Sequence, residues 1–361
     1  MSFGSTTALE KQLRSWLCAR FPNTAMKPKS CAILSGIIKP SLLSQLTTKT
    51  ALASLLIMAS PVALSLPFAL PSNPEDSLIR EFDEGFNKQT IATDDEDLLD
   101  IARRFDLGQN EIMRLNPDVD RWLPKAGTQI KLQSERLLPD TSRSGLVLNL
   151  PEFRMYYFPK AEKDSLPSVL TYPMSIGRQD WETPLGQTKI VAKKENPTWT
   201  PPESIKKEHA AKGDPLPDVV AAGPDNPLGL FAMRLGIPGY LIHSTNKAYG
   251  VGMQVSHGCI RMYPEDIEKF FPIIKVGTPV KIVNQAVKVG WFKDTLYIEV
   301  HPPLETHQAD NLLDIALDLI ELNNAGVLPV LDGKALRNAL IEKKGSPIKI
   351  YVRPEFTIPE F

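Results

Sequence analysis

The sequence predicts a mainly β domain, a β-sandwich or flattened barrel, as the central part of a multidomain chain. With 361 residues the chain is longer than a typical single domain. Its middle third carries short apolar runs of strand length, separated by turn residues. One helical pattern interrupts these runs. It begins at Pro264, carries two acidic residues in its first turn, and places Ile267, Phe270 and Phe271 on one buried face.

Residues 1–71 predict an export leader. Seven basic residues precede the apolar run and face one acid, Glu10, while residues 51–70 carry no charge. Positive charge before an apolar stretch is typical of exported proteins, so we expect a periplasmic location. Two prolines and several small residues in the run favour a cleaved signal over a retained anchor, although twenty uncharged residues are enough to span a bilayer. Met26 is an alternative start of translation.

Residues 72–88 are polar and predict a linker, and residues 89–134 predict a small β-α-α-β module. This order resembles that of a LysM domain, a module that binds glycans containing N-acetylglucosamine. The family's usual Gly-Asp-Thr turn is replaced here by the acidic run 93–97. That run also suits the first turn of a helix, so a structural spacer is the alternative to a glycan-binding module.

The central domain is expected to span residues 143–284, and an appendage to follow it. Apolar runs predict strands at 146–150, 153–158, 169–176, 188–192, 229–235, 240–243 and 279–283. Beyond them, a strand pattern at 295–300 and helical patterns at 311–323 and 334–343 predict a small α/β appendage over residues 285–361. Its residues do not indicate a role.

A cysteine and a histidine carry the main indication of chemistry. His243 stands sixteen residues before Cys259, which lies in the run Ser256-His257-Gly258-Cys259-Ile260-Arg261-Met262. A thiol attacks a carbonyl as thiolate, so a nearby imidazole can activate it. Gly258 lets backbone N–H groups approach a developing oxyanion.

Two other interpretations also fit these residues. The thiol can be a buried structural one, and two histidines with a cysteine can hold zinc, although neither His-x-x-x-His nor paired-Cys spacing is present. Cys18 and Cys31 lie in the leader, so Cys259 is the single thiol of the predicted exported part. A solitary thiol in an oxidising compartment favours a nucleophile.

The flanking motifs extend this pattern over residues 143 to 290. They are Ile176-Gly177-Arg178, Thr183-Pro184-Leu185-Gly186, Asn196-Pro197-Thr198-Trp199-Thr200-Pro201, Ala222-Gly223-Pro224 and Asn226-Pro227-Leu228-Gly229. Together with the Ser-His-Gly-Cys-x-Arg run they resemble the L,D-transpeptidase (YkuD-like) family, in its ErfK/YbiS-type branch. That branch includes enzymes that attach Braun's lipoprotein to peptidoglycan.

The resemblance implies a role for each matching residue. Cys259 is the nucleophile, His243 is the proton donor and acceptor, His257 orients the site, and the backbone at Gly258 binds the oxyanion. Arg261 holds a substrate carboxylate, or forms a salt bridge that supports the loop. The remaining expected substrate-binding residues are Ser256, Thr245, Ser244, which stands where relatives often have Gly, and Trp199, which lines the groove or fills the core.

The implied reaction joins peptidoglycan stem peptides through a thioester, with release of D-alanine and without metal or other cofactor. The acceptor is a second stem, the lysine of an outer-membrane lipoprotein, or water, and the motif does not distinguish them. A net charge of −1 argues against nucleic acid as a partner. Contact with the membrane is expected only through an uncleaved leader. The alternative to an enzyme is a protein that binds the cell wall without catalysis. The sequence does not indicate an oligomeric state.

Overall fold

The computed structural model describes residues 68–80, 89–160, 166–307 and 311–354, all within one compact unit, Ser60–Phe361. The predicted export leader up to residue 67 lies outside the described residues. Within the described ranges, no helix is long and apolar enough to cross a membrane.

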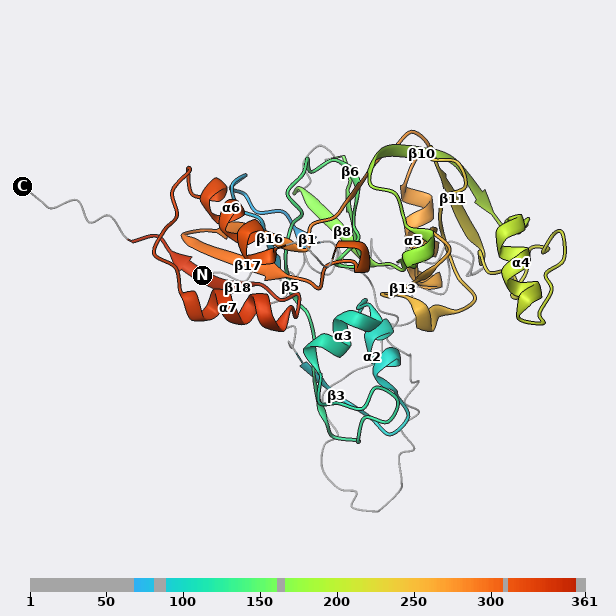
Figure 1. The fold of residues 1–361 in the computed structure, drawn as a ribbon, viewed down its shortest axis with the longest axis horizontal. Helices are drawn as coiled ribbons and strands as arrows, with labels where there is room; N and C mark the ends of the chain where they lie inside the picture. The colour runs from blue at the N-terminus through green and yellow to red at the C-terminus, as the bar shows by residue number, and fades with distance from the viewer. Residues whose placement is uncertain (1–67, 81–88, 161–165, 308–310, 355–361) are drawn as a thin grey trace, which may run out of the picture. The chain divides into compact units, whose positions relative to one another are not determined.

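The central domain is built on one nine-stranded sheet (Figure 1). In spatial order its strands are β1 (Phe68–Ala69), β8 (Ser168–Pro173), β7 (Arg154–Phe158), β6 (Gly145–Asn149), β15 (Pro279–Val283), β10 (Gly186–Glu195), β11 (Phe231–Leu235), β12 (Leu241–His243) and β14 (Ile260–Arg261). Neighbouring strands are antiparallel except β6 with β15 and β12 with β14. The prediction of a mainly β domain is confirmed, with the long strands in one continuous sheet rather than in the two sheets of a sandwich.

Two helices belong to this domain, where the sequence predicted one. The predicted helix is α5 (Pro264–Ile273), which begins at its proline and buries Ile267, Phe270 and Phe271 in the core of the sheet. The second, α4 (Glu203–Ala211), was missed. Ile205 is its one buried residue, so α4 lacks the apolar stripe from which helices are recognised in a sequence.

The module over residues 89–134 consists of β3 (Gln89–Ile91), α2 (Leu98–Arg104), α3 (Gln109–Leu115) and β4 (Gln129–Lys131), with β3 and β4 antiparallel. Asp97 caps α2, because its carboxylate accepts hydrogen bonds from the backbone of Leu99 and Asp100 at 2.8 Å each. The acidic run therefore serves the helix start. Membership of the LysM family stays a prediction.

Part of the predicted linker is structured, which corrects that expectation. Residues Leu78–Arg80 form β2, which pairs with β5 (Glu135–Leu137), and both Leu78 and Ile79 are buried. Phe68–Ala69, assigned by sequence to the leader, forms β1 and pairs with β8. Segments of two or three residues are too short to show a strand period, so the sequence pattern did not reveal them.

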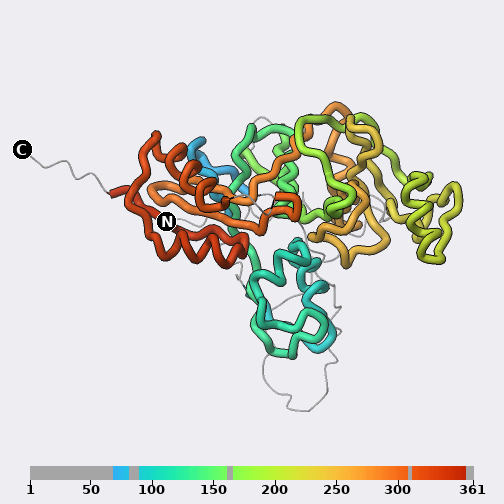
Figure 2. Tube along the Cα trace, in the orientation of Figure 1, coloured from blue at the N-terminus to red at the C-terminus, as the bar shows by residue number. Residues whose placement is uncertain are grey.

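The C-terminal appendage contains a three-stranded sheet of β16 (Val287–Phe292), β17 (Thr295–Val300) and β18 (Ile348–Val352), with α6 (Leu312–Asn323) and α7 (Gly333–Glu342) packed on it. It is the orange-to-red end of the trace in Figure 2. Strands β16 and β18 were not predicted.

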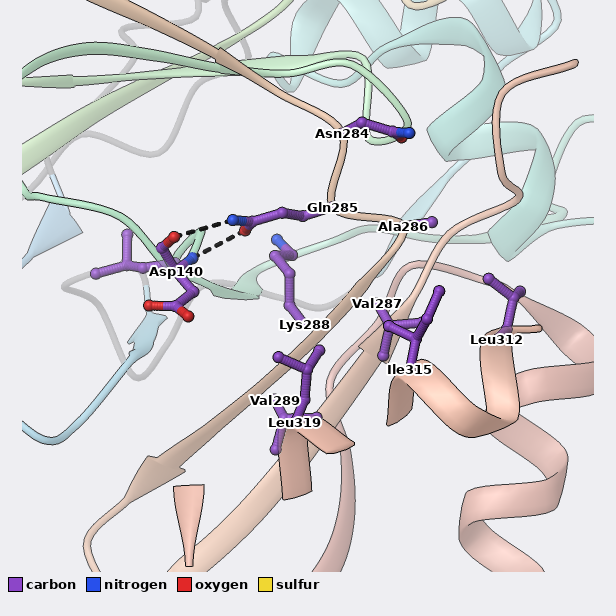
Figure 3. Close-up of a pocket in the computed structure, with 11 residues that line it drawn as sticks. Asp140, Asn284, Gln285, Ala286, Val287, Lys288, Val289, Leu312, Ile315 and Leu319 are labelled. Atoms are coloured by element: carbon purple, nitrogen blue, oxygen red, sulfur yellow. Dashed lines mark hydrogen bonds between the residues drawn. The ribbon is translucent and has the colours of Figure 1, made fainter. Parts of the chain in front are cut away.

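A cavity of about 180 Å³ opens beside α6 and β16 (Figure 3). Leu312, Ile315 and Leu319 line it from α6, and its polar rim includes Asp140 and Gln285, which hydrogen-bond each other. Cys259 does not belong to its lining. The cavity is therefore separate from the predicted reactive thiol.

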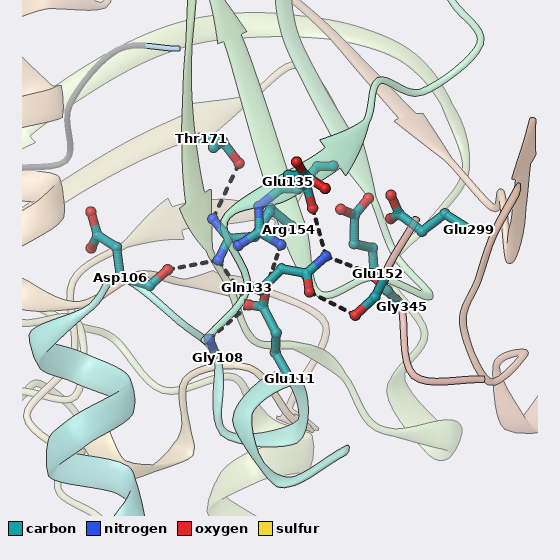
Figure 4. A network of polar contacts seen from close by, with 12 residues as sticks. Asp106, Gly108, Glu111, Gln133, Glu135, Glu152, Arg154, Thr171, Glu299 and Gly345 are labelled. Carbon is teal, nitrogen blue, oxygen red and sulfur yellow. Dashed lines mark hydrogen bonds and ion pairs between the residues drawn. The ribbon is translucent and has the colours of Figure 1, made fainter. Parts of the chain in front are cut away.

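Buried ion pairs join the small module to the sheet (Figure 4). Glu111 on α3 pairs with Arg154 of β7 at 2.8 Å and with Arg136 of β5, while Arg154 also donates to the carbonyl of Asp106 at 2.6 Å. The backbone N–H of Gln109 donates to the Val251 carbonyl at 3.0 Å. The module is thus packed against the central domain.

Candidate active site

The pairing of β12 with β14 brings the predicted site residues together. Ile242 faces Ile260 and His243 faces Arg261 in this parallel pair. Both isoleucines are fully buried in the core, and side chains alternate along a strand, so His243 and Arg261 share the opposite face. Cys259 directly precedes Ile260, the first residue of β14. Arg261 accordingly influences the pKa of both Cys259 and His243.

His243 is held as a neutral imidazole. Its side chain is buried, and Nδ1 lies 2.5 Å from the carbonyl oxygen of Ser244. A carbonyl only accepts, so Nδ1 carries the hydrogen in this contact, and the backbone of Leu228 forms a further hydrogen bond with the ring. Burial, followed by the positive charge of Arg261, lowers the pKa of His243 to about 3. The ring is therefore unprotonated at neutral pH, and it is a weaker base than an exposed histidine.

Cys259 is a free, partly exposed thiol whose Sγ lies 3.6 Å from the Gly239 carbonyl. Burial raises the pKa of the thiol, while a backbone hydrogen bond from Leu241 and the charge of Arg261 oppose that rise. The resting state is the thiol rather than the thiolate, so reaction requires a base.

The segment 256–261, here called the Cys259 loop, is fixed by close backbone packing. Gly258 has φ +96°, and a Cβ there would lie 2.8 Å from the ring of Tyr240. Thr183 Oγ1 donates to the Gly258 carbonyl at 2.8 Å and accepts from the Gly177 amide at 3.0 Å. Ser256 Oγ donates to the carbonyl of Cys259 at 2.5 Å. Glycine is therefore required at 258 by both conformation and space.

The loop also lies beside a short second sheet. There β13 (Gln254–Ser256) pairs in parallel with β9 (Ile176–Gly177). A 3-10 turn at Gln179–Trp181 follows β9. Strand β9 belongs to the motif around Ile176, and β13 ends at Ser256, the first residue of the Cys259 motif. The pairing of these strands therefore brings together motifs that are far apart in the sequence.

Two comparisons with known proteins identify the family. Residues 143–282 match the YkuD family model, the L,D-transpeptidase catalytic domain. The probable L,D-transpeptidase YbiS of Escherichia coli K12 is 39% identical over 256 residues, which are 69% of this chain and 82% of that protein. This chain belongs to the L,D-transpeptidase family. The probable L,D-transpeptidases ErfK/SrfK and YcfS of the same organism are 38% and 36% identical, covering 71% and 81% of this chain and 80% and 92% of theirs.

The remaining predicted residues of this L,D-transpeptidase have the following surroundings. Arg261 is partly buried, and among the described atoms its Nε is a buried donor without a hydrogen-bond partner. Ser244 is buried and packs against Gly229. A Cβ added to Gly229 would lie 2.6 Å from the Cβ of Ser244. Thr245 Oγ1 accepts from the Lys247 amide at 3.0 Å. Trp199 is partly exposed and its backbone forms a bridge to Val220.

His257 has partners that the sequence did not reveal. Its Nε2 lies 2.9 Å from a carboxylate oxygen of Glu208 on α4, and the same oxygen accepts from Arg178 at 2.6 Å. The ring of Trp181 meets the imidazole edge-to-face, with ring centroids 5.4 Å apart. Arg178 belongs to a motif quoted above and was open to recognition, whereas Glu208 lies in a helix that carried no signal.

One cluster of possible metal ligands occurs among the described residues. Glu152, Glu299 and His301 have ligand atoms within 4.8 Å of one another, close to the network of Figure 4. The ammonium of Lys288, however, lies 2.9 Å from Glu152 and 2.6 Å from Glu299. A buried cation of the chain itself thus balances both carboxylates, so this cluster is an internal ion-pair network.

Proposed function

We propose that this protein is a peptidoglycan L,D-transpeptidase that works through a thioester on Cys259. The observation that supports the proposal is the β12–β14 register, which pairs His243 with Arg261, two residues after Cys259. An unprotonated imidazole, a thiol and a cation that influences the pKa of both support acyl transfer by a cysteine, because a thiol needs a base or a positive field to react as thiolate.

In the first step His243 Nε2 takes the Cys259 proton, and the thiolate attacks the carbonyl of the third stem residue, taken as diaminopimelate from the family resemblance. Backbone N–H groups at Gly258 and Cys259 are suited to stabilise the oxyanion. The C–N bond to D-alanine then breaks, and the imidazolium returns its proton to the departing amine. A thioester and free D-alanine result.

In the second step an amine attacks the thioester, His243 removes its proton, and Cys259 leaves as the thiol. The amine of a second stem gives a 3-3 cross-link, a lipoprotein lysine gives an anchored protein, and water gives the carboxypeptidase reaction. The unpaired Nε of Arg261 supports a role in holding a carboxylate of the stem, because a guanidinium fork suits that group. Ser256, Thr245, Ser244 and Trp199 complete the proposed binding surface.

We place the reaction in the periplasm, on the basis of the export leader, with the LysM-like module on the glycan strands. The alternative is a wall-binding protein without catalysis. The intact base, thiol and cation support the enzyme, since they serve no purpose in glycan binding.

The test is the intact mass of the protein after mixing with a disaccharide-tetrapeptide, with Cys259→Ala beside it. We expect a thioester adduct and free D-alanine from the parent and neither from the variant. Products left in solution then separate cross-linking from hydrolysis. A parent that releases no D-alanine and gains no mass, although it binds the peptidoglycan fragment, would point to the wall-binding alternative.

A further inference from the structure

A single carboxylate, Glu208 of α4, links its own helix to two other segments, the Cys259 loop and the segment that follows β9. Its Oε2 lies 2.9 Å from His257 Nε2 and 2.6 Å from an Arg178 nitrogen, and its Oε1 lies 2.6 Å from the ammonium of Lys212. His257 belongs to the Cys259 loop, Arg178 follows β9, and Lys212 ends α4. The side chain of Glu208 is only 21% exposed, although α4 is a surface helix. Its two carboxylate oxygens are therefore occupied by these three partners.

The contact fixes the state and the orientation of His257. Hydrogen bonds from Arg178, Lys212 and His257 lower the pKa of Glu208, so its carboxylate is ionised and only accepts. His257 Nε2 must carry the hydrogen in this contact. The edge-to-face contact with Trp181 holds the same ring from another side. The imidazole is thus held by a carboxylate and an indole at once.

Glu208 is also the residue through which α4 reaches the site in the described part of the chain. The helix buries one apolar side chain, Ile205, and its other ion pairs are exposed ones, as in Lys206 with Glu203 and Asp218. A helix with so little apolar burial depends on specific polar contacts for its position. Loss of the Glu208 carboxylate would release both the helix and the imidazole.

We infer that Glu208 is a positioning residue for acyl transfer, which acts through His257 and Arg178 to keep the Gly258 and Cys259 amides aimed at the oxyanion. Arg178 contributes from both ends, because its backbone N–H also donates to the Ser256 carbonyl at 3.0 Å. The inference rests on the proposed function. The thiol is served separately by His243 and Arg261 on the β12–β14 pair, so Glu208 affects formation of the tetrahedral intermediate rather than the reactivity of the thiol.

The test compares Glu208→Gln with the parent, in the full chain, by two reactions of Cys259. The first is thioester formation with the disaccharide-tetrapeptide, which needs the oxyanion site. The second is alkylation by iodoacetamide, which does not. Alkylation is followed by mass spectrometry of the Cys259 peptide, with the Cys18 and Cys31 peptides as internal references. The matched control is Glu203→Gln, on the same helix and away from His257.

For Glu208→Gln we expect the maximal rate of thioester formation to fall about 10-fold to 100-fold, with KM and the alkylation rate each within about 2-fold of the parent. The control should match the parent in all three. The double variant with His257→Ala should lose less than the product of the two single losses, because both changes break the Glu208–His257 contact, while the Arg178 contact is lost only with Glu208.

Three results would overturn the inference. One is a Glu208→Gln variant that acylates at the parental rate. Another is an equal loss of acylation and alkylation together with a lower melting temperature, which would make Glu208 a purely structural residue. The third is a double variant whose losses multiply. If the parent itself forms no thioester, the proposed function falls and takes this inference with it, whereas the three results above leave the proposed function standing.

Discussion

Arg261 lies directly opposite His243 across the parallel β12–β14 pair, and its charge lowers the pKa of that imidazole while it also lowers the pKa of Cys259. One cation therefore keeps the base unprotonated and makes the thiol easier to ionise. The lower thiol pKa favours proton transfer from sulfur to nitrogen, whereas the lower imidazole pKa keeps the ring unprotonated at neutral pH but opposes that transfer.

Replacement of Arg261 by Gln should make Cys259 harder to ionise, because the burial that raises the thiol pKa is then less opposed. We expect alkylation of Cys259 at neutral pH to slow about 3-fold to 10-fold and its pH profile to move upward. Iodoacetamide labelling across pH measures this. Arg234→Gln, on the exposed face of neighbouring β11, is the matched control and should leave the profile in place. An unchanged profile in Arg261→Gln would contradict the electrostatic role.

Protonation of His243 should destabilise the fold in acid. Its pKa is lowered from 6.5 to about 3, so the unfolded chain binds more protons than the native one between those values. The stabilisation is present above pH 6.5 and is lost as the pH falls toward 3. Urea midpoints measured through this range should decline less in His243→Gln than in the parent. The partly exposed His307→Gln should decline as the parent does, and equal slopes for all three proteins would refute the prediction.

Gly258→Ala should disable the Cys259 loop. The added Cβ meets the Tyr240 ring at 2.8 Å, and a φ of +96° is strained for any L side chain. We expect thioester formation to fall at least about 100-fold, with a stability loss of about 1–3 kcal/mol. Gly333→Ala at the start of α7 is the control, since its Cβ meets nothing within 4 Å. Activity of Gly258→Ala close to that of the parent would contradict the strain argument.

Glu111→Gln should weaken the joint between the module and the sheet. Burial raises the pKa of Glu111, but Arg136 and Arg154 outweigh it and hold the pKa at about 2. Removing the charge leaves two buried guanidinium groups without their partner, at a cost of about 3–5 kcal/mol. Urea unfolding of the full chain measures this loss. Glu96→Gln, whose pair with Arg104 lies nearer the surface of the module, should cost less than about 1 kcal/mol.

The same pair gives a pH dependence with a definite sign. Because the pKa of Glu111 is lowered from 4.5 to about 2, its contribution is complete above pH 4.5 and is lost as the pH falls toward 2. Glu111→Gln should lack that part of the acid sensitivity. An acid profile identical to that of the parent would show that the ion pair does not support the fold.

Sequence reasoning reached the features that leave a local pattern. The apolar runs of β6 and β7, and the proline, acids and apolar stripe of α5, are such patterns, and all three elements are present. The association of His243 with Cys259 was predicted from a motif, and the β12–β14 register pairs His243 with Arg261, two residues after Cys259.

Features that depend on distant partners were not predictable. Glu208 contacts His257, which is 49 residues away in the sequence. The helix that carries Glu208, α4, has no apolar stripe from which it could be predicted. Lys288 and Glu299 look like surface positions of a strand but are buried against each other. The burial and the partners of such groups are set by tertiary packing, which the local sequence pattern does not indicate.

Phe68–Ala69 form the outermost strand at one side of the nine-stranded sheet, where they cover the backbone of Ser168 and Val169. Unpaired strand edges are templates for aggregation. Removal of Phe68 and Ala69 would leave the backbone of β8 unpaired along this edge of the sheet. The folded domain therefore limits how far proteolytic trimming of its N-terminal side can proceed while the protein stays monodisperse.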